Sequence, residues 1–172
     1  MNFFELIRNR RSVRRFKNKK IEEEKIRLLE ESALRAPSSR GLNPWKFLFV
    51  KDKELIAKFA KAKEHGAEFL KGAQLAVVVC ADRDVSDVWI EDCSIASIYI
   101  QLAAEELGLG SCWAQIRNRF RNKDEKARDY LAKLLSLPEN IEIESIIGIG
   151  YPLYKPKPVP EEKLEWKKVT IL

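Results

Sequence analysis

The stretch from Trp89 to Trp113 carries the longest apolar pattern of the chain and predicts a central helix. Between Cys93 and Leu109 the apolar and small residues cover most of a helix circumference, which is typical of a helix that packs on several sides. Gly108 and Gly110 then end it, because glycine readily adopts the left-handed conformation that closes a helix. We expect a strand from Ser111 to Ile116 after this corner. A glycine-rich corner lets a flat ligand approach the backbone, although an ordinary helix stop is the commoner reason for one.

The pattern of apolar and polar residues also predicts the other helices and strands. Asn2 and Glu5 form the start signal of a short helix that precedes Arg10. Further helices are predicted over Glu22–Arg35, over Lys53–Lys63 continuing toward Leu70, and over Asp124–Leu135, with strands over Trp45–Val50, Gln74–Cys80 and Ile143–Gly150. The continuously apolar run QLAVVVC favours a strand covered on both faces. Taken alone, strands that alternate with helices suggest parallel βαβ units.

Length and hydropathy describe a single domain over residues 1–172, of which 153–172 form an extended arm because YPLYKPKPVPEEK is rich in proline. No apolar run reaches the ~20 residues that a membrane-spanning helix needs. The first residues, MNFFELIRNRRS, carry an acid within their apolar part and lack a small-residue cleavage site, so they make a poor secretory signal. We therefore expect a cytoplasmic protein that does not bind membranes.

Three cysteines and one histidine, His65, form no recognisable metal-ligand set, so no metal site is predicted. The net charge of +6 and the pI near 9.2 raise the possibility of nucleic-acid binding, but 26 acidic residues are interspersed with the basic ones. The excess of positive charge lies near the two ends of the chain. If those ends meet in space, they suit a small phosphorylated ligand. Abundant Lys and Glu also hint at a thermophilic source.

Two polar segments are candidates for ligand binding. In RRSVRRF, Arg10, Ser12 and Arg14 alternate, so an extended chain would point all three side chains to one side. Arginines placed there suit a phosphate and a carbonyl-rich ring edge, but a solvated basic turn is an equally good reading of this segment alone. The loop SSRGLNP, before the strand at Trp45, is rich in hydroxyl and amide groups that either bind a heteroaromatic ligand or simply turn the chain.

Four motifs together resemble the nitroreductase family of flavin enzymes: RRSVRRF, APSSRGLNPWKF, LGLGSCW and GIGYP. Their order and spacing both match. The resemblance implies an α+β fold with three layers, α/β/α, in which a mostly antiparallel sheet lies between helices. It also implies an intertwined homodimer that holds FMN at the interface, with the long central helix packed there.

The resemblance also assigns residues to the flavin. Arg10, Arg11, Ser12 and Arg14 match the segment that reaches the phosphate, the ribityl chain and the pyrimidine edge, where Arg14 would stabilise negative charge. Candidates in the remaining segments are Pro37, Ser38, Ser39 and Asn43 from the other subunit, backbone at Gly110 and Ser111, and Lys155 or Lys157 at the phosphate. Gly41 and Asn43 depart from the Asn and Gln that many members carry, and the chain lacks an obvious helical lid between Trp113 and Lys123.

The predicted function is that of an FMN-dependent oxidoreductase, in which NAD(P)H and a small acceptor such as a nitroaromatic or quinone react in turn at the flavin. The cofactor carries the hydride, so we expect no catalytic acid or base among the side chains. A flavin-binding sensor or carrier without turnover is the alternative. A basic nucleic-acid-binding module, a third class, would show steep salt dependence and no bound chromophore.

Overall fold

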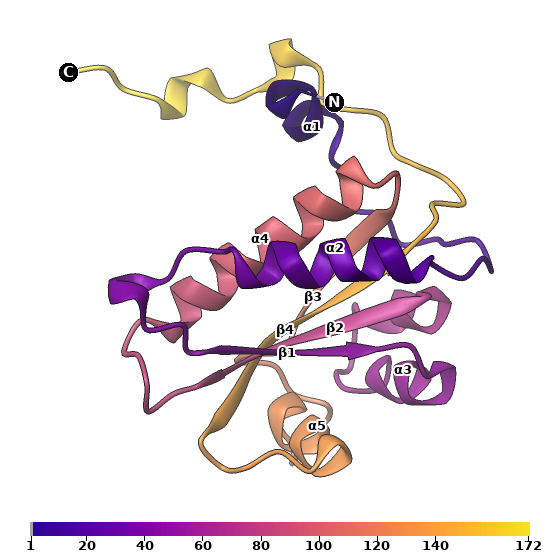
Figure 1. Ribbon diagram of the computed structural model, residues 1–172, viewed down its shortest axis with the longest axis vertical. Helices are drawn as coiled ribbons and strands as arrows, with labels where there is room; N and C mark the ends of the chain where they lie inside the picture. The colour runs from indigo at the N-terminus through magenta and orange to yellow at the C-terminus, as the bar shows by residue number, and fades with distance from the viewer. Residues whose placement is uncertain (1) are drawn as a thin grey trace.

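The computed structural model describes residues 2–172 as a four-stranded antiparallel sheet between two layers of helices (Figure 1). The strand order is β1-β2-β4-β3. The main elements are α1 (Phe3–Asn9), α2 (Glu23–Leu34), β1 (Trp45–Val50), α3 (Lys53–Phe59), β2 (Leu75–Asp82), α4 (Trp89–Glu106), β3 (Gly110–Gln115), α5 (Ala127–Leu135) and β4 (Ile141–Gly150), with short 3-10 turns η1 (Ser39–Gly41), η2 (Glu68–Gly72), η3 (Glu161–Lys163) and η4 (Trp166–Lys168).

The sheet confirms the α+β class that the family resemblance implies. Each neighbouring pair of strands runs antiparallel, whereas the alternation of strands and helices alone would have suggested parallel units. The apolar strand β2 lies in the interior of the sheet between β1 and β4, and all its residues except Asp82 are buried. Its register with β4 shifts between Val79 and Cys80, where the ladder skips Glu144. This bulge brings an acidic residue into the core.

Each face of the sheet has its own hydrophobic core. On one face α2 and α4 pack through Leu29 and Ile100, both fully buried, against alternate residues of β2 and β4. On the other face α3, η2 and α5 contribute Phe59, Leu70 and Leu131. Figure 1 shows the two helical layers above and below the strands. The α/β/α layering follows from the alternation of side chains along buried strands.

Helix α4 is apolar well beyond the side that meets the sheet. Ile100 and Ala104 are fully buried, while Ile95, Ile98 and Tyr99 on the outer side remain 37–40% exposed. Six aliphatic or aromatic side chains of α1 and α4 are thus open to solvent in the single chain, since Phe3, Phe4 and Ile7 of α1 are exposed as well. The two helices also contact each other.

Three predicted helix boundaries were wrong. The helix from Lys53 ends at Phe59 instead of running toward Leu70, because the chain turns at 60–66 and Gly66 adopts φ +81°. Helix α5 begins at Ala127, not Asp124, since the side chain of Asn122 accepts hydrogen bonds from the Asp124 and Glu125 N–H groups and closes a turn first. Helix α4 begins at Trp89, four residues before the apolar pattern.

The C-terminal segment 153–172 leaves the body of the molecule and runs past α1, as the yellow trace in Figure 1 shows. Its only regular structure is the two turns η3 and η4, and its apolar side chains, including Trp166 and Ile171, are exposed. No helix among residues 2–172 is long and apolar enough to span a bilayer. The three cysteines are reduced and buried, as their number and spacing suggest.

Candidate functional site

The segment that contains Arg10, Arg11, Ser12 and Arg14 is held by backbone pairing. Ser12 forms a parallel bridge with Ser111 of β3, and the Val13 N–H donates to the Ser111 carbonyl over 2.9 Å. Further on, Phe16 pairs with Pro152, and the Lys17 N–H donates to Tyr151 over 2.8 Å. The segment therefore lies between β3 and the chain that follows β4. The two basic ends of the chain meet in space, which is the condition under which they suit a small phosphorylated ligand.

Gly110 is the residue that allows this docking. A Cβ atom built at Gly110 would lie 2.7 Å from the Cβ of Val13 and 2.8 Å from both of its γ-carbons, closer than side chains can approach. Val13 is fully buried in this contact. The glycine-rich corner is thus more than a helix stop. Gly108 turns the chain at φ +72°, and Gly110 has no side chain, so that Val13 of the basic segment can pack directly on its backbone.

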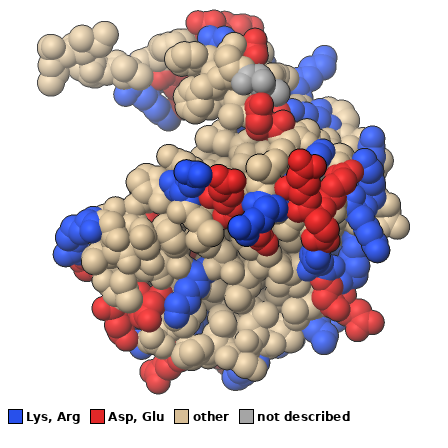
Figure 2. Space-filling view, viewed as in Figure 1, with Lys and Arg blue, Asp and Glu red and all other residues tan. Residues whose placement is uncertain are grey.

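A cavity of about 1100 Å³ opens in front of this segment. Arg10, Arg11, Ser12 and Arg14 line it together with residues of α1 and of the C-terminal arm, among them Phe4, Ile7, Arg8, Pro156, Pro158, Val159, Glu161, Leu164 and Trp166. Four arginines face one glutamate, and within residues 2–172 Arg10, Arg11 and Arg14 have no carboxylate within ion-pairing distance. Figure 2 shows the hollow between the arm and the body. The cavity is wide, apolar on one wall and positively charged on the other.

The two late lysines do not line this cavity. Lys155 instead forms an ion pair with Glu105 at the end of α4, whose side chain is only 3% exposed. This pair fixes the start of the arm against the body, because a buried carboxylate requires a partner. Lys157 lies two positions further along the arm and forms no ion pair within residues 2–172. Of the two candidates for the phosphate, Lys155 is therefore already engaged.

The loop with Pro37, Ser38, Ser39 and Asn43 is built on side-chain hydrogen bonds. The Ser38 hydroxyl donates to Asn43 Oδ1 over 2.7 Å and accepts from the Asn43 N–H over 2.9 Å. Ser39 donates its N–H to Asp92 Oδ1 over 2.8 Å, and Asp92 is 2% exposed. Positive φ angles at Arg40, Gly41 and Asn43 give the loop its tight shape. Asp92 had no sequence signal beyond its place in the first turn of a helix.

The loop and the arginine segment lie at opposite ends of α4. Asp92, which holds the loop, is in the first turn, whereas Gly110 and Ser111 follow the last turn. With a rise of 1.5 Å per residue, roughly 20 Å of helix separates the two. One chain therefore does not bring together the two groups of residues that the sequence assigned to a single ligand, and the loop faces a different region of space.

The ionisable groups of the core leave little scope for side-chain catalysis. Burial raises the pKa of the Cys80 thiol to about 12, and burial likewise raises the pKa values of Cys93 and Cys112. His65 is 87% exposed, and the described residues hold no cluster of three metal-ligating side chains. Burial also raises the pKa of Glu144, although hydrogen bonds from Ser94 and Gln115 oppose the shift.

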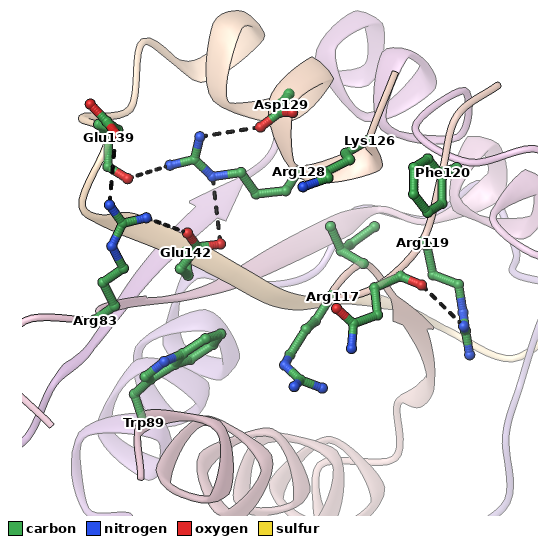
Figure 3. A pocket seen from close by; sticks show the side chains of 12 residues that line it. Arg83, Trp89, Arg117, Arg119, Phe120, Lys126, Arg128, Asp129, Glu139 and Glu142 are labelled. Atoms are coloured by element: carbon green, nitrogen blue, oxygen red, sulfur yellow. Dashed lines mark hydrogen bonds and ion pairs between the residues drawn. The ribbon is translucent and has the colours of Figure 1, made fainter. Parts of the chain in front are cut away.

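A second cavity, of about 690 Å³, lies at the far end of the sheet between the starts of α4 and α5 (Figure 3). Its lining residues are Arg83, Trp89, Ile116, Arg117, Asn118, Arg119, Phe120, Lys126, Arg128, Asp129, Glu139 and Glu142. The sequence reading did not single it out. The run IRNRF, with arginines on alternate positions after a strand, is the signal that could have indicated it.

The architecture and the arginine segment packed on a glycine corner define a flavoprotein-like α/β/α protein, and comparison with known proteins gives the family. Residues 7–81 and 61–151 match the model described as the Nitroreductase family, so the chain belongs to the nitroreductase family. A solved FMN-dependent nitroreductase from Clostridium difficile R20291 is 43% identical, with a TM-score of 0.96 over 98% of both chains.

Two archaeal proteins similar in sequence agree with this family. A protein from Archaeoglobus fulgidus, named as a candidate NADH dehydrogenase/NAD(P)H nitroreductase, is 38% identical over 86% of this chain and 83% of its own. One with the same name from Methanothermobacter thermautotrophicus is 34% identical over 91% of this chain and 80% of its own. The family resemblance first found in four short motifs is thereby confirmed over nearly the whole chain.

Proposed function

We propose that this protein is a homodimeric FMN-dependent oxidoreductase that uses NAD(P)H to reduce a small acceptor. The cavity in front of Arg10, Arg11, Ser12 and Arg14 carries the proposal, since one of its walls is positively charged and the segment that forms this wall is docked on β3 through Gly110. The support from relatives is the 43% identity with an FMN-dependent nitroreductase and the NAD(P)H nitroreductase names of the archaeal proteins.

The residues present fit FMN. Its phosphate needs donors with positive charge, and three arginines without carboxylate partners among the described residues supply them. The corner at Gly110 and Ser111 holds the arginine segment in place, because Val13 packs on Gly110 and its N–H donates to the Ser111 carbonyl. The four family motifs supply one phosphate site and no GxGxxG fingerprint, which favours FMN over FAD. Lys157 remains the late lysine available to the phosphate.

A second subunit would complete the site. Because the loop with Ser38 and Ser39 lies at the other end of α4, it reaches the flavin of a neighbouring subunit more readily than its own. The exposed apolar side chains of α1 and α4, such as Phe4, Ile98 and Tyr99, are the surface that such a neighbour would cover. Two sites per dimer then follow from twofold symmetry.

The side chains bind and tune the cofactor and leave the redox chemistry to it. When bound, FMN would supply the hydride chemistry between NAD(P)H and a nitroaromatic, quinone or similar acceptor, the two reacting in turn. Arg10 and Arg11 bind the phosphate end, and Arg14 places positive charge at the pyrimidine edge. Protons come from solvent, since the cavity is open and the buried thiols are protonated at neutral pH.

The absorption spectrum of the purified protein tests the cofactor, and chromatography of the released chromophore separates FMN from FAD. We expect FMN, bleached without oxygen by NADH or NADPH and restored by a quinone or nitroaromatic. A bound flavin that neither nucleotide bleaches would support a sensor or carrier in place of the enzyme. A colourless protein whose reconstitution with FMN fails would refute the proposal.

Arg10→Ala tests the assignment of the arginine segment. It should weaken FMN binding by about 1.5–3 kcal/mol, the range for a hydrogen bond to a charged group. Arg27→Ala is the matched control, because Arg27 is an exposed arginine of α2 that pairs only with Glu30. Fluorescence titration of both apoproteins with FMN gives the comparison, and equal affinities would remove Arg10 from the site.

A further inference from the structure

Three cations of the second cavity form no ion pair within residues 2–172. Arg117, Arg119 and Lys126 lie within 4.0 Å of no carboxylate there, and Arg119 donates a hydrogen bond to the Asn118 carbonyl over 3.2 Å. Figure 3 shows Arg117 extending toward the side of Trp89 and Lys126 pointing into the space between Arg128 and Phe120. All three residues line the cavity, Arg119 with its guanidinium turned toward the Asn118 carbonyl.

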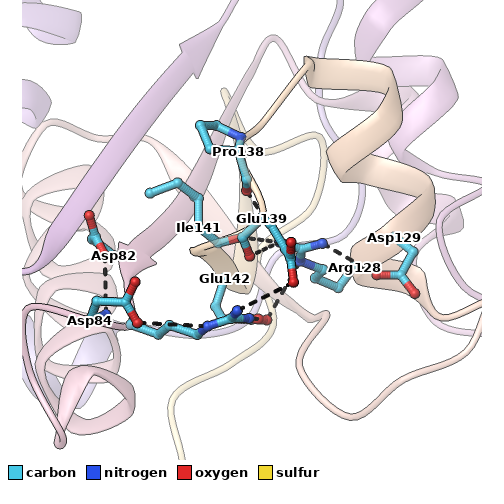
Figure 4. A network of polar contacts seen from close by, with 9 residues as sticks. Asp82, Asp84, Arg128, Asp129, Pro138, Glu139, Ile141 and Glu142 are labelled. Carbon is cyan, nitrogen blue, oxygen red and sulfur yellow. Dashed lines mark hydrogen bonds and ion pairs between the residues drawn. The ribbon is translucent and has the colours of Figure 1, made fainter.

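The three carboxylates of the cavity pair with two of its five cations, Arg83 and Arg128. Arg83 Nη1 lies 2.8 Å from Glu142 Oε1, and Arg83 also approaches Glu139 at 3.8 Å. Arg128 lies 3.6 Å from Glu142 and 3.4 Å from Asp129, and its Nη2 donates to backbone carbonyls at 138, 139 and 141 (Figure 4). With those carboxylates paired, the charge left over is positive.

The loop that carries the cations is held in place by backbone bonds. The Arg117 N–H donates to the Glu144 carbonyl over 3.1 Å, the Ala127 N–H to the Arg119 carbonyl over 2.9 Å, and Phe120 bridges to Lys126. Asn118 takes a positive φ of 56° to close the turn. A site whose donors are fixed before the ligand arrives loses less entropy on binding.

Aromatic side chains and position indicate what the ligand is. Trp89 and Phe120 offer ring faces on two sides of the cations, which suits a ligand with a flat ring next to its negative charge. Trp89 begins α4, in the same stretch as Asp87 and Asp92, which hold the loop of Ser39 and Arg40. If that loop borders the flavin of the other subunit, the cavity lies beside the same flavin.

We propose that this cavity binds the adenosine diphosphate half of NAD(P)H. The inference rests on the proposed function, because the nicotinamide ring of the same molecule must meet the flavin next to the loop. The diphosphate contacts Arg117, Arg119 and Lys126, and the adenine stacks on Trp89 or Phe120. Each subunit thus holds its own flavin phosphate with Arg10–Arg14 and supplies the donor cavity for the flavin of its neighbour.

Direct binding tests the cavity independently of turnover. Titration calorimetry of the FMN-loaded protein with ADP-ribose should show binding that the double variant Arg119→Ala/Lys126→Ala weakens at least tenfold, as loss of charge-assisted bonds predicts. Both side chains are exposed, so the fold should survive. Arg27→Ala is the control. Absence of ADP-ribose binding to the wild type, or equal affinity in the double variant, would overturn the proposal.

Kinetics distinguish this inference from the proposed function. The double variant should raise KM for NADH and NADPH at least tenfold with kcat kept, and should leave KM unchanged for N-benzyl-dihydronicotinamide, which has the reactive ring and no phosphate. Equal changes in KM for all three donors would contradict the cavity assignment. Turnover with any of them would still support the proposed oxidoreductase function. Failure of every donor to reduce the flavin would refute the proposed function, and ADP-ribose binding would still decide whether the cavity takes this ligand.

Discussion

The two ends of helix α4 hold their ligand segments by different means. At the C-terminal end, backbone pairing and close packing fix the arginine segment, with Val13 pressed against Gly110. At the N-terminal end, buried polar groups fix the loop of Ser38 and Ser39, with Asp92 as the central acceptor. One end is therefore sensitive to added volume, and the other to lost hydrogen bonds. The two halves of the proposed flavin site are thus stabilised by different kinds of contact.

The largest effect is expected from Asp92→Ala. Asp92 is almost fully buried and accepts from the Ser39 N–H at 2.8 Å and the Ser86 hydroxyl at 3.2 Å. Removing it leaves both donors unsatisfied, and the free energy of unfolding should fall by about 2–3 kcal/mol. Urea unfolding measures this. Unchanged stability would mean that polar contacts do not hold the N-terminal end.

Gly110→Ala should destabilise the other end by steric conflict. The new methyl group meets Val13 within 2.8 Å, and overpacking of this kind costs about 1–3 kcal/mol. FMN affinity should fall as well, because the arginine segment must shift. Gly72→Ala is the matched control, since its new Cβ would meet only Phe16, at 3.9 Å. Equal behaviour of the two variants would show that close packing is not what Gly110 provides.

A smaller effect of opposite sign is expected from Glu144→Gln. Burial raises the pKa of Glu144 in the folded state, so the folded protein holds this proton more tightly than the unfolded chain does. The charged form therefore costs stability above the folded pKa, and that cost disappears as pH falls below the ordinary value near 4.5. The glutamine variant should be more stable than wild type at pH 7–8 and equal to it near pH 4. Thermal melts across this range test the sign, and a constant difference would contradict it.

The smallest effect is expected from Asp87→Asn, which removes the ion pair with Arg40 on the surface of the loop. Both side chains are more than 60% exposed, so the loss should be at most about 1 kcal/mol and should shrink in high salt. Urea unfolding at low and high salt gives the comparison with Asp92→Ala. A loss as large as that of Asp92→Ala would show that the exposed pair, and not the buried acceptor, fixes the loop.

Much of the fold was predictable because local patterns and long-range structure agree. The strand Trp45–Val50 was predicted with its observed bounds, since a continuous apolar run bounded by turn residues has one reading. The antiparallel topology was not readable from periodicity and came from the family resemblance. The helix from Lys53 was overextended, because alanines at 60, 62 and 67 continue a helical pattern although they pack in a turn.

The candidate site likewise has a part that local patterns predict and a part that they do not. Alternation in RRSVRRF indicated that Arg10, Ser12 and Arg14 would lie together, and they line one cavity, but Arg11 lines it as well. The pairing of Lys155 with Glu105 and of Ser39 with Asp92 joins residues about fifty positions apart, and no local pattern records such contacts. In the sequence, Arg117, Arg119 and Lys126 are charges without a recognisable motif, because only the fold brings them to one cavity.

Mixed dimers test most directly whether each flavin site is shared between subunits. One variant carries Arg10→Ala/Arg14→Ala and the other Asp92→Ala, and each alone should be depleted of FMN. The two variants are co-expressed with different tags, and the mixed dimer is purified through both tags. If each site is shared, this dimer has one site with two damaged halves and one site with two intact halves. Sharing predicts one FMN per mixed dimer, against two for wild type. A mixed dimer as empty as its parents would show that each site belongs to a single chain.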